Sequence, residues 1–245
     1  ICDQWKSWID LLSRLPVKFS PFKKPVRMSL LISLLIAYLL GSIPFGLLIG
    51  RFWLGIDVRH QGSGNIGMTN VMRVGGKLPG ALTFILDFGK AWLAVMIAAV
   101  LLAEESTPEP ALGILMLVGA FTILGHVFPV FLRFKGGKGV SCQIGTLLAV
   151  YYPLALVGMG TWLIMFAWKK ISSLSAIVML CVLPPASLVL PGMIWDLPTW
   201  DLSTIQFALS LLLLYSHRDN LRRLREGSES TLQDPSSTTS SQRSK

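Results

Sequence analysis

The chain has 245 residues, of which 52% are hydrophobic and 14% are charged, and its mean hydropathy is +0.60. Because soluble domains carry roughly 25% charged residues, this composition excludes an ordinary soluble protein and predicts an all-α integral membrane protein with one domain. The formal net charge of +9 suits anionic lipid or anionic substrates, whereas the placement of the cations in short segments between apolar runs argues against nucleic acid.

Residues 1–27 contain six Lys and Arg and differ in composition from the chain that follows. We expect them to be a basic extension outside the native fold, with Met28 as the natural start. The alternative is an amphipathic segment that lies on anionic lipid. An uncharged run then covers residues 29–50, which at about 1.5 Å per residue is long enough as one helix to cross a bilayer. The membrane domain is expected over residues 28–227.

The stretch HQGSGNIGMTN, residues 60–70, has glycines in the spacing of a dinucleotide-binding turn. That interpretation requires a strand and a helix of a βαβ unit, and here an apolar membrane span precedes the stretch. Ser63, Asn65 and Arg73 lie among or just after the glycines, where backbone N–H groups and a guanidinium can converge on an anion. The stretch therefore predicts a phosphate loop. The alternative is a set of turns followed by a cation that merely marks the cytoplasmic side.

The placement of charge predicts how often the chain crosses the membrane. Four segments are basic and polar, and the positive-inside rule assigns all of them to the cytoplasm: residues 51–77, 133–138, 169–173 and 217–225. A pair of helices around an acidic turn fits between the first two segments, and another pair fits between the last two. Because residues 140–168 must return to the same side, we expect two short helices broken near residues 151–153. The prediction is seven transmembrane helices, with the N-terminus outside and the C-terminus in the cytoplasm.

Asp87 and Lys90 are three residues apart within the second predicted span. Ionisable side chains are costly in a bilayer and are usually paired there, so we expect a structural ion pair near the site. His126 and Pro129 are expected to pack or bend the third helix near its cytoplasmic end, and the alternative is a direct role in the site. We expect no metal and no cofactor, because the spacing of the cysteines forms neither a metal site nor a disulfide framework. The cysteines are Cys2, Cys142 and Cys181.

The stretch FKGGKGVS, residues 134–141, directly precedes an apolar helix. Lys135 and Lys138 flank Gly136 and Gly137, so two ammonium groups, free backbone amides and a helix N-terminus can meet one anion. The pattern is not a Walker loop, because no Ser or Thr follows the second lysine. The alternative is a basic, flexible cytoplasmic turn.

The two remaining basic segments also carry polar side chains. Ser172 and Ser173 follow a pair of lysines, and His217 and Asn220 are three residues apart, so that they share one helix face. The alternative for the last segment is a basic interfacial helix that ends the last span. The four segments together hold hydroxyls, amides and cations but few carboxylates, which favours binding of anions over abstraction of protons. Residues 228–245 are mainly Ser, Thr and Gln, and we expect a disordered tail.

Five stretches identify a family resemblance: GSIPFG, GSGNIGMTN, GHVFPVFLRFKGGKGVS, KISSLS and HRDNLRRLREGSE. In this order they resemble the signature stretches of the bacterial acyl-phosphate:glycerol-3-phosphate acyltransferase family, over residues 28–229. The resemblance implies seven transmembrane helices with an external N-terminus, in the bacterial inner membrane, and an active site on the cytoplasmic face. It also implies transfer of an acyl group from acyl phosphate to the sn-1 hydroxyl of glycerol 3-phosphate, which gives lysophosphatidic acid and phosphate in phospholipid biosynthesis. The implied partners are the two substrates, membrane lipid and the enzyme that forms acyl phosphate.

The resemblance also implies roles for individual residues. Catalytic roles fall on Ser63, His217 and Asn220, of which the last two orient glycerol 3-phosphate. Substrate-binding roles fall on the remaining polar and glycine positions: Asn65, Arg73, Lys135, Gly136, Gly137, Lys138, Ser172 and Ser173. This chain departs from the family pattern at Met68, where alanine is usual, and at Ser141 and Cys142; none of these positions supplies a charge.

The chemistry expected from these residues is a single displacement. A Ser-His-Asp triad needs a base oriented by a carboxylate, and the adjacency of His217 and Asp219 in sequence does not provide one. The His-x4-Asp signature of acyl-CoA-dependent acyltransferases is also missing. We therefore expect the phosphate of the acyl phosphate to accept the proton, with glycine amides or serine hydroxyls as donors to the oxyanion. The alternative function is a transporter or scramblase of phosphorylated lipids.

Overall fold

The computed structural model describes residues 26–103, 112–195 and 200–231, and over these ranges the protein is entirely helical apart from its turns and loops. The predicted extension over residues 1–27 therefore falls almost wholly outside the described residues. The same holds for the acidic turn between the second and third predicted spans and for residues 232–245 of the predicted tail.

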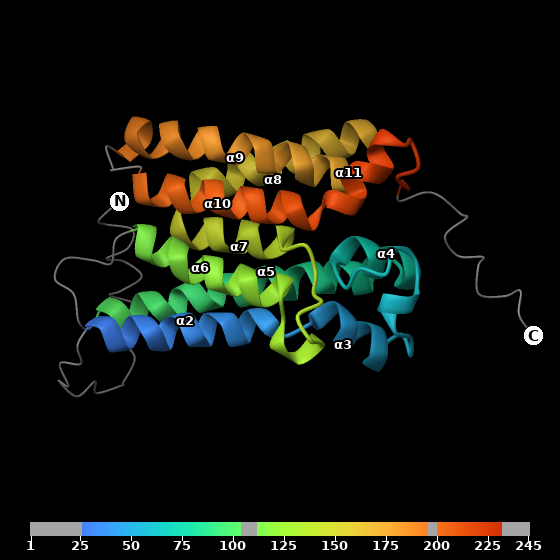
Figure 1. The fold of residues 1–245 in the computed structure, drawn as a ribbon, viewed down its shortest axis with the longest axis horizontal. Helices are drawn as coiled ribbons and strands as arrows, with labels where there is room; N and C mark the ends of the chain where they lie inside the picture. The colour runs from blue at the N-terminus through green and yellow to red at the C-terminus, as the bar shows by residue number, and fades with distance from the viewer. Residues whose placement is uncertain (1–25, 104–111, 196–199, 232–245) are drawn as a thin grey trace, which may run out of the picture.

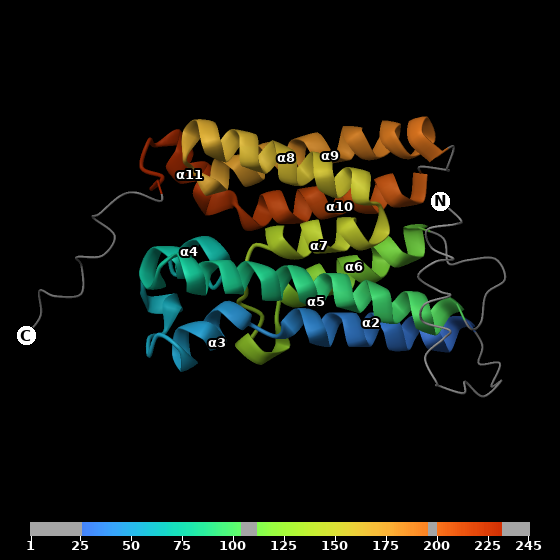
Figure 2. The same cartoon turned by 180° about the vertical axis from the view of Figure 1, so that it is seen from behind.

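Seven of the described helices lie side by side with their axes roughly along one direction, and the shorter ones gather at one end (Figures 1 and 2). The long set is α2 (Val26–Ser42), α5 (Lys77–Ala103), α6 (Leu112–Val127), α7 (Val140–Val150), α8 (Tyr152–Lys169), α9 (Ser172–Trp195) and α10 (Trp200–Ser216). The short elements are α3 (Phe45–Phe52), η1 (Val58–His60), α4 (Met68–Gly75), η2 (Val130–Leu132) and α11 (Arg218–Arg225). We call the end that holds α3, α4 and α11 the loop end.

Four helical segments in the described part of the chain are long and apolar enough to cross a bilayer: Met28–Phe52, Lys77–Ala103, Leu112–Leu132 and Ser172–Ile194. Helix α7 has 11 residues. At 1.5 Å per residue it is about 16 Å long, roughly half the thickness of a hydrocarbon core. The count of seven crossings therefore stays a prediction, whereas the all-helical architecture is confirmed for the described residues.

The run over residues 29–50 is confirmed as part of an apolar segment long enough to cross a bilayer, but its helix breaks between α2 and α3 at Ile43 and Pro44. Proline has no N–H group and its ring collides with the preceding turn, so the helix cannot run through it unchanged. The break exposes the carbonyl oxygen of Ile43, which accepts a hydrogen bond of 2.8 Å from Lys90 Nζ. A side chain of α5 thus replaces the partner that the helix lost.

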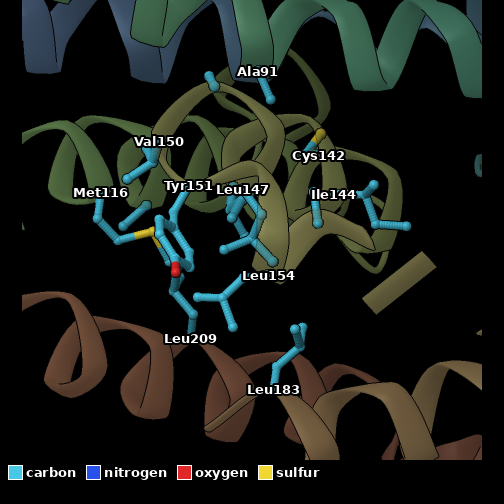
Figure 3. Packing of buried hydrophobic residues seen from close by; sticks show 14 of the residues in the cluster. Ala91, Met116, Cys142, Ile144, Leu147, Val150, Tyr151, Leu154, Leu183 and Leu209 are labelled. Carbon is cyan, nitrogen blue, oxygen red and sulfur yellow. The ribbon is translucent and has the colours of Figure 1, made fainter. Parts of the chain in front are cut away.

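The predicted break near residues 151–153 is confirmed. Helix α7 ends at Val150, and α8 begins at Tyr152 with Pro153 in its first turn, where proline is tolerated. Tyr151 lies between the helices, is fully buried, and donates from its hydroxyl to the carbonyl oxygen of Leu190 in α9 at 3.0 Å. Figure 3 shows its ring within the largest apolar cluster, near Leu147 and Leu154. The break is thereby anchored in the core.

Helices α2 and α6 approach each other closely, because each presents a glycine to the other. A side chain at Gly41 would collide with the carbonyl oxygen of Thr122, and one at Gly125 would collide with that of Tyr38. In lipid, association of helices depends on such close packing because no hydrophobic effect drives it. The contact fixes the end of α6, where His126 lies.

Candidate functional site

A cavity of about 560 Å³ is lined by residues from most of the helices and from the loops of the loop end. Eight of the predicted site residues line it: Ser63, Asn65, Arg73, Lys138, Ser172, Ser173, His217 and Asn220. They come from four segments that are widely separated in sequence. The structure therefore gathers the polar segments in one place, as the single predicted site requires.

Lys135, Gly136 and Gly137 do not line the cavity, although we predicted substrate-binding roles for them. Lys135 is exposed. The amide of Gly136 donates to the carbonyl oxygen of Val127 at 3.1 Å, and that of Gly137 donates to the carbonyl oxygen of His126 at 3.0 Å. The prediction of free glycine amides is wrong, because these amides satisfy carbonyl groups at the end of α6 that have no partner within the helix.

The N-terminus of α7 does open on the cavity. Gly139, Val140 and Ser141 belong to the lining, and the first amides of a helix have no partner within it. An anion at this end would meet those N–H groups and the positive end of the helix dipole. The predicted helix N-terminus therefore remains available, even though the glycine amides before it are not.

Five side chains form what we call the loop-end network: Lys138, Ser173, Asn220, Arg223 and Glu229. The Lys138 ammonium donates to Asn220 Oδ1. Glu229 Oε1 accepts from Ser173 Oγ at 2.7 Å and from Asn220 Nδ2 at 2.6 Å, and its Oε2 accepts from Arg223 Nε at 2.6 Å. One carboxylate thereby joins α9, α11 and the loop before α7.

Sequence reasoning missed Glu229, since we placed the start of a disordered tail at residue 228. The structure instead orders residues 228–231 against the helices, and Glu229 lines the cavity. The available signal was the place of Glu229 at the end of the quoted stretch HRDNLRRLREGSE, six residues after Arg223. Burial acts to raise the pKa of Glu229, but the hydrogen bonds from Ser173, Asn220 and Arg223 outweigh it and hold the pKa below its usual value.

Lys138 is a partly buried cation whose charged form is disfavoured by its surroundings. Burial lowers its pKa from 10.5 to about 8, the charge of Glu229 offsets part of this change, and the charges of Arg223 and Arg73 add to it. At pH 7 the side chain is therefore mainly an ammonium. An anionic ligand beside it would stabilise this charged form further.

His217 is 2% exposed and follows the last residue of α10. Burial, and after it the charge of Lys138, lowers its pKa from 6.5 to about 4. Its Nδ1 lies 2.7 Å from the carbonyl oxygen of Leu213. Because a carbonyl oxygen can only accept, the proton of the neutral ring is on Nδ1, and Nε2 presents a lone pair.

The first polar loop is shaped by a buried asparagine. Asn70 Oδ1 accepts from the amide of Ser63 at 2.8 Å, and its Nδ2 donates to the carbonyl oxygens of Val58 at 2.9 Å and Gln61 at 3.0 Å. The hydroxyls of Thr69 and Ser172 are 2.9 Å apart, which connects this loop with the start of α9. The loop is therefore held in place before any ligand binds.

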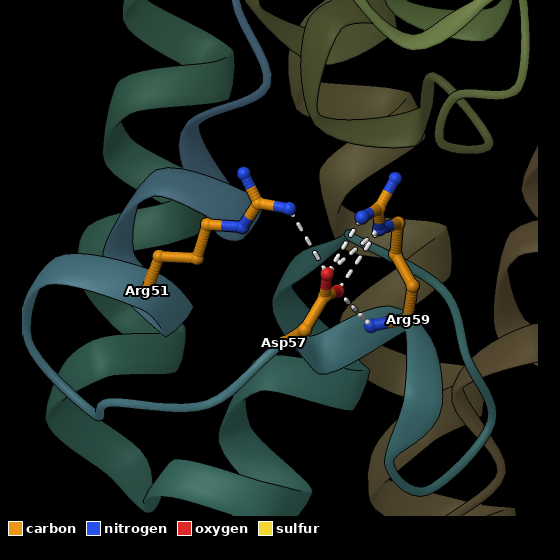
Figure 4. Close-up of polar contacts among 3 residues, drawn as sticks. All are labelled: Arg51, Asp57 and Arg59. Carbon is orange, nitrogen blue, oxygen red and sulfur yellow. Dashed lines mark hydrogen bonds and ion pairs between the residues drawn. The ribbon is translucent and has the colours of Figure 1, made fainter.

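A salt bridge on the surface braces the entrance to the same loop (Figure 4). Asp57 lies 2.6 Å from Arg59 and 3.2 Å from Arg51, and its Oδ1 also accepts from the amide of Arg59 at 3.0 Å. The hydrogen bond from the Arg59 side chain is the main cause that holds the pKa of Asp57 far below its usual value. These groups shape the turn at η1 and do not line the cavity.

The predicted ion pair of Asp87 and Lys90 is present and buried. Lys90 Nζ lies 2.7 Å from Asp87 Oδ1, and both side chains are at most 3% exposed. The same ammonium lies 3.0 Å from His126 Nδ1, in addition to its bond to Ile43. We call Asp87, Lys90 and His126 the helix cluster. His126, for which we favoured a packing or bending role over a direct one, lines the cavity together with Asp87.

Asp87, His126 and Cys142 also offer three possible metal ligands within 4.8 Å of one another. The ammonium of Lys90, however, already lies between the carboxylate and the imidazole. Cys142 Sγ donates to the backbone carbonyl oxygen of Asp87 at 3.1 Å. The positive charge of Lys90 beside the carboxylate and the imidazole therefore disfavours a second cation at these three side chains.

These features define a class of protein: an integral membrane protein with a cavity whose wall carries several cations. The sequence matches the family described as glycerol-3-phosphate acyltransferase over residues 31–227. The chain therefore belongs to the glycerol-3-phosphate acyltransferase family, in agreement with the resemblance seen in its sequence motifs.

Relatives and solved structures agree with this assignment. The glycerol-3-phosphate acyltransferase of Jannaschia sp. (strain CCS1) is 45% identical over 198 residues, which cover 80% of this chain and 89% of that protein. The one from Bradyrhizobium diazoefficiens is 42% identical over 201 residues, with 82% and 94% covered. The chain is also similar to the crystal structure of PlsY (YgiH), an integral membrane glycerol 3-phosphate acyltransferase, in its glycerol 3-phosphate form. The TM-score is 0.72 and the sequence identity is 36%, and the match covers 83% of this chain and 95% of that chain. Its lysophosphatidic acid form has a TM-score of 0.71 and 35% identity, with the same coverage.

Proposed function

We propose that this protein transfers an acyl group from acyl phosphate to the sn-1 hydroxyl of glycerol 3-phosphate and releases lysophosphatidic acid and phosphate. The observation that carries the proposal is the composition of the cavity wall. Arg73, Lys138 and Arg223 supply positive charge, and the N-terminus of α7 supplies amides. Two phosphorylated substrates repel each other, so a site that holds both needs several cations.

The rest of the cavity wall is apolar and fits an acyl chain. Phe84 from α5, Ile144 from α7, and Met159 and Trp162 from α8 all belong to the lining. An acyl phosphate can therefore keep its chain among the helices while its head group meets the cations. Such binding places the activated carbonyl beside the hydroxyl of the second substrate.

The chemical step is a single displacement. The sn-1 hydroxyl oxygen attacks the carbonyl carbon of the acyl phosphate, and the bond from that carbon to the phosphate oxygen breaks. The phosphate leaves with the electron pair and takes up the proton of the hydroxyl, so atoms and charge balance without a covalent enzyme intermediate.

His217 and Asn220 orient the hydroxyl in this proposal. The lone pair on His217 Nε2 accepts a hydrogen bond from it, and a ring with a pKa of about 4 is too weak a base to retain the proton. The ring is held by the backbone oxygen of Leu213 and not by a carboxylate, so it lacks the orienting acid of a triad. The serine hydroxyls have other roles: Ser172 contacts Thr69, and Ser173 donates to Glu229.

An assay with purified protein in lipid vesicles tests the proposal. Glycerol 3-phosphate is supplied with acyl phosphate, acyl-CoA or acyl carrier protein in turn, and the lipid products are identified by mass spectrometry. We expect lysophosphatidic acid from acyl phosphate alone. A trapped acyl-enzyme would contradict the single displacement, and transport of phosphorylated lipid without product from any donor would support the transporter alternative.

The proposal includes seven crossings of the bacterial inner membrane, with the loop end in the cytoplasm and an external N-terminus. It also includes delivery of the donor by the enzyme that forms acyl phosphate. Single cysteines in place of Lys135 and Glu226, both exposed, test the orientation with a reagent that does not cross membranes. We expect labelling only after the cells are opened; labelling of either position in intact cells would overturn the assignment.

A further inference from the structure

The single displacement builds negative charge on the carbonyl oxygen, and this charge needs a hydrogen-bond donor. The glycine amides that the sequence suggested for this task are bound to carbonyl groups of α6. The same cavity wall contains a different donor, the imidazole of His126, which the proposed function does not use.

Lys90 determines which nitrogen of His126 can donate. Its ammonium forms an ion pair with Asp87 Oδ1 at 2.7 Å, donates to the Ile43 carbonyl oxygen at 2.8 Å and lies 3.0 Å from His126 Nδ1. An ammonium only donates, so His126 Nδ1 is the acceptor in this contact and a ring hydrogen is on Nε2. Lys90 is thus a positioning residue for the imidazole.

His126 Nε2 lies close to Gly137, which is outside the cavity lining but directly precedes the lining residue Lys138. A side chain at Gly137 would collide with this atom, so the nitrogen lies against the backbone just before Lys138. The residue is 5% exposed and belongs to the lining. Among the described residues no hydrogen bond to Nε2 is present. The Nε2–H group can therefore donate to a ligand in the cavity.

We propose that His126 Nε2–H donates a hydrogen bond to the carbonyl oxygen of the acyl donor, where it stabilises the charge of the transition state. The inference rests on the proposed function and adds a catalytic residue to it. Asp87, the carboxylate 3.5 Å from His126 Nδ1, is one helical turn after Phe84, which belongs to the apolar wall. This places the imidazole on the side of the acyl chain. The carboxylate itself is neutralised by Lys90 and does not repel the oxyanion.

Two substitutions of the same residue separate this role from a structural one. In His126→Asn, the amide oxygen takes the place of Nδ1 and still accepts from Lys90, but nothing replaces Nε2. In His126→Gln, the longer amide places an N–H group near the position of Nε2, while the acceptor for Lys90 is lost. The control is Thr122→Val, one turn earlier in α6, which removes a buried hydroxyl that does not line the cavity.

We expect His126→Asn to lower kcat roughly 10²-fold, the usual effect of removing one oxyanion donor, with KM for glycerol 3-phosphate and the melting temperature near the wild-type values. His126→Gln should keep kcat within about tenfold of the wild type, and Thr122→Val within about twofold. Single-turnover rates and the affinity for a non-transferable acyl phosphonate separate chemistry from binding.

A purely structural role predicts the opposite order, with His126→Asn active and His126→Gln impaired, and that result would overturn the inference. So would a kcat of His126→Asn within threefold of the wild type. If the wild-type protein makes no lysophosphatidic acid from acyl phosphate, the proposed function fails instead, so the two failures are distinguishable.

Discussion

The loop-end network and the helix cluster contain the same kinds of charged and polar groups but differ in how their charges are balanced. In the helix cluster, one ammonium meets three acceptors, and its charge is balanced by Asp87 at 2.7 Å. In the loop-end network, Lys138 and Arg223 share a single carboxylate, and Arg73 lies in the same cavity wall. In the helix cluster the charge of Lys90 is balanced by Asp87, and the pair stabilises the fold. The loop-end network instead retains positive charge for a ligand.

The two buried histidines show the same contrast. His217 Nδ1 donates to a backbone oxygen, so Nε2 accepts; His126 Nδ1 accepts from Lys90, so Nε2 donates. The partner of one ring nitrogen thus decides what the other can do. The role of a polar residue in this protein therefore depends on how many hydrogen-bond and ion-pair partners the protein already supplies.

The largest expected effect comes from removing the Asp87–Lys90 ion pair of the helix cluster. Lys90→Met leaves the carboxylate of Asp87 buried and unpaired, which should lower the free energy of unfolding by about 3–5 kcal/mol. Thermal unfolding in detergent measures the change. The double variant Asp87→Asn with Lys90→Met removes both charges and should be more stable than the single variant. If the wild type and Lys90→Met were equally stable, the helix cluster would not stabilise the fold and would not differ from the loop-end network in this respect.

Lys138→Met removes the cation of the open network. We expect kcat/KM to fall roughly 10²- to 10³-fold, because the variant loses the positive charge that contacts the phosphorylated ligand. The melting temperature should change little. Steady-state kinetics with acyl phosphate measure the loss. Lys135→Met is the matched control, since Lys135 is exposed and outside the cavity, and it should stay within about twofold. Equal losses in both variants would contradict the geometry of the site.

The same lysine predicts the alkaline limit of activity. The pKa of Lys138 is lowered to about 8, so the ammonium that binds anions is present below this pH and is lost above it. The value of kcat/KM should therefore fall about tenfold for each pH unit above pH 8. Lys138→Arg keeps its charge and should flatten the profile between pH 8 and pH 9. Identical profiles for the two proteins would assign the titration to another group.

His217→Gln has a smaller expected effect. The amide oxygen of Gln can accept the hydrogen bond that Nε2 accepts, so we expect kcat to fall only about 2- to 10-fold, the equivalent of one imperfect hydrogen bond. His217→Leu, which has no acceptor, should be slower than the Gln variant. A loss of four orders of magnitude in His217→Gln would instead make His217 a general base.

Asp57→Asn should have the smallest effect. The salt bridges of Asp57 are partly exposed and lie outside the cavity, and such pairs contribute about 0–1 kcal/mol. We expect kcat/KM within about twofold of the wild type and a slightly lower melting temperature. A large loss of activity would show that the turn at η1 affects the cavity more than its contacts indicate.

The sequence was sufficient for features that depend on local chemistry. The break at Tyr151 followed from Pro153 and from the need to return to one side, and the pair of Asp87 and Lys90 followed from the cost of charge in lipid. The gathering of the polar segments followed from the prediction that the positive-inside rule puts all of them on one side of the membrane. Each of these predictions needed only composition, spacing or a known property of the bilayer.

The features that were missed depend on contacts between distant segments. The amides of Gly136 and Gly137 are taken by the end of α6, and Glu229 is ordered by partners on α9 and α11. The break at Pro44 is stabilised by a lysine 47 residues away along the chain. Single-sequence patterns carry no record of such pairings, because each partner alone is typical of a turn or of a tail.

Glu229 follows every helix that the structure describes, yet it closes the wall of the cavity. During translation the apolar segments enter the bilayer first, and this carboxylate leaves the ribosome after all of them. A partly made chain would therefore present Lys138 and Arg223 without their shared anion. The wall of the cavity is therefore completed only when the segment after α11 folds back onto helices that are already inserted.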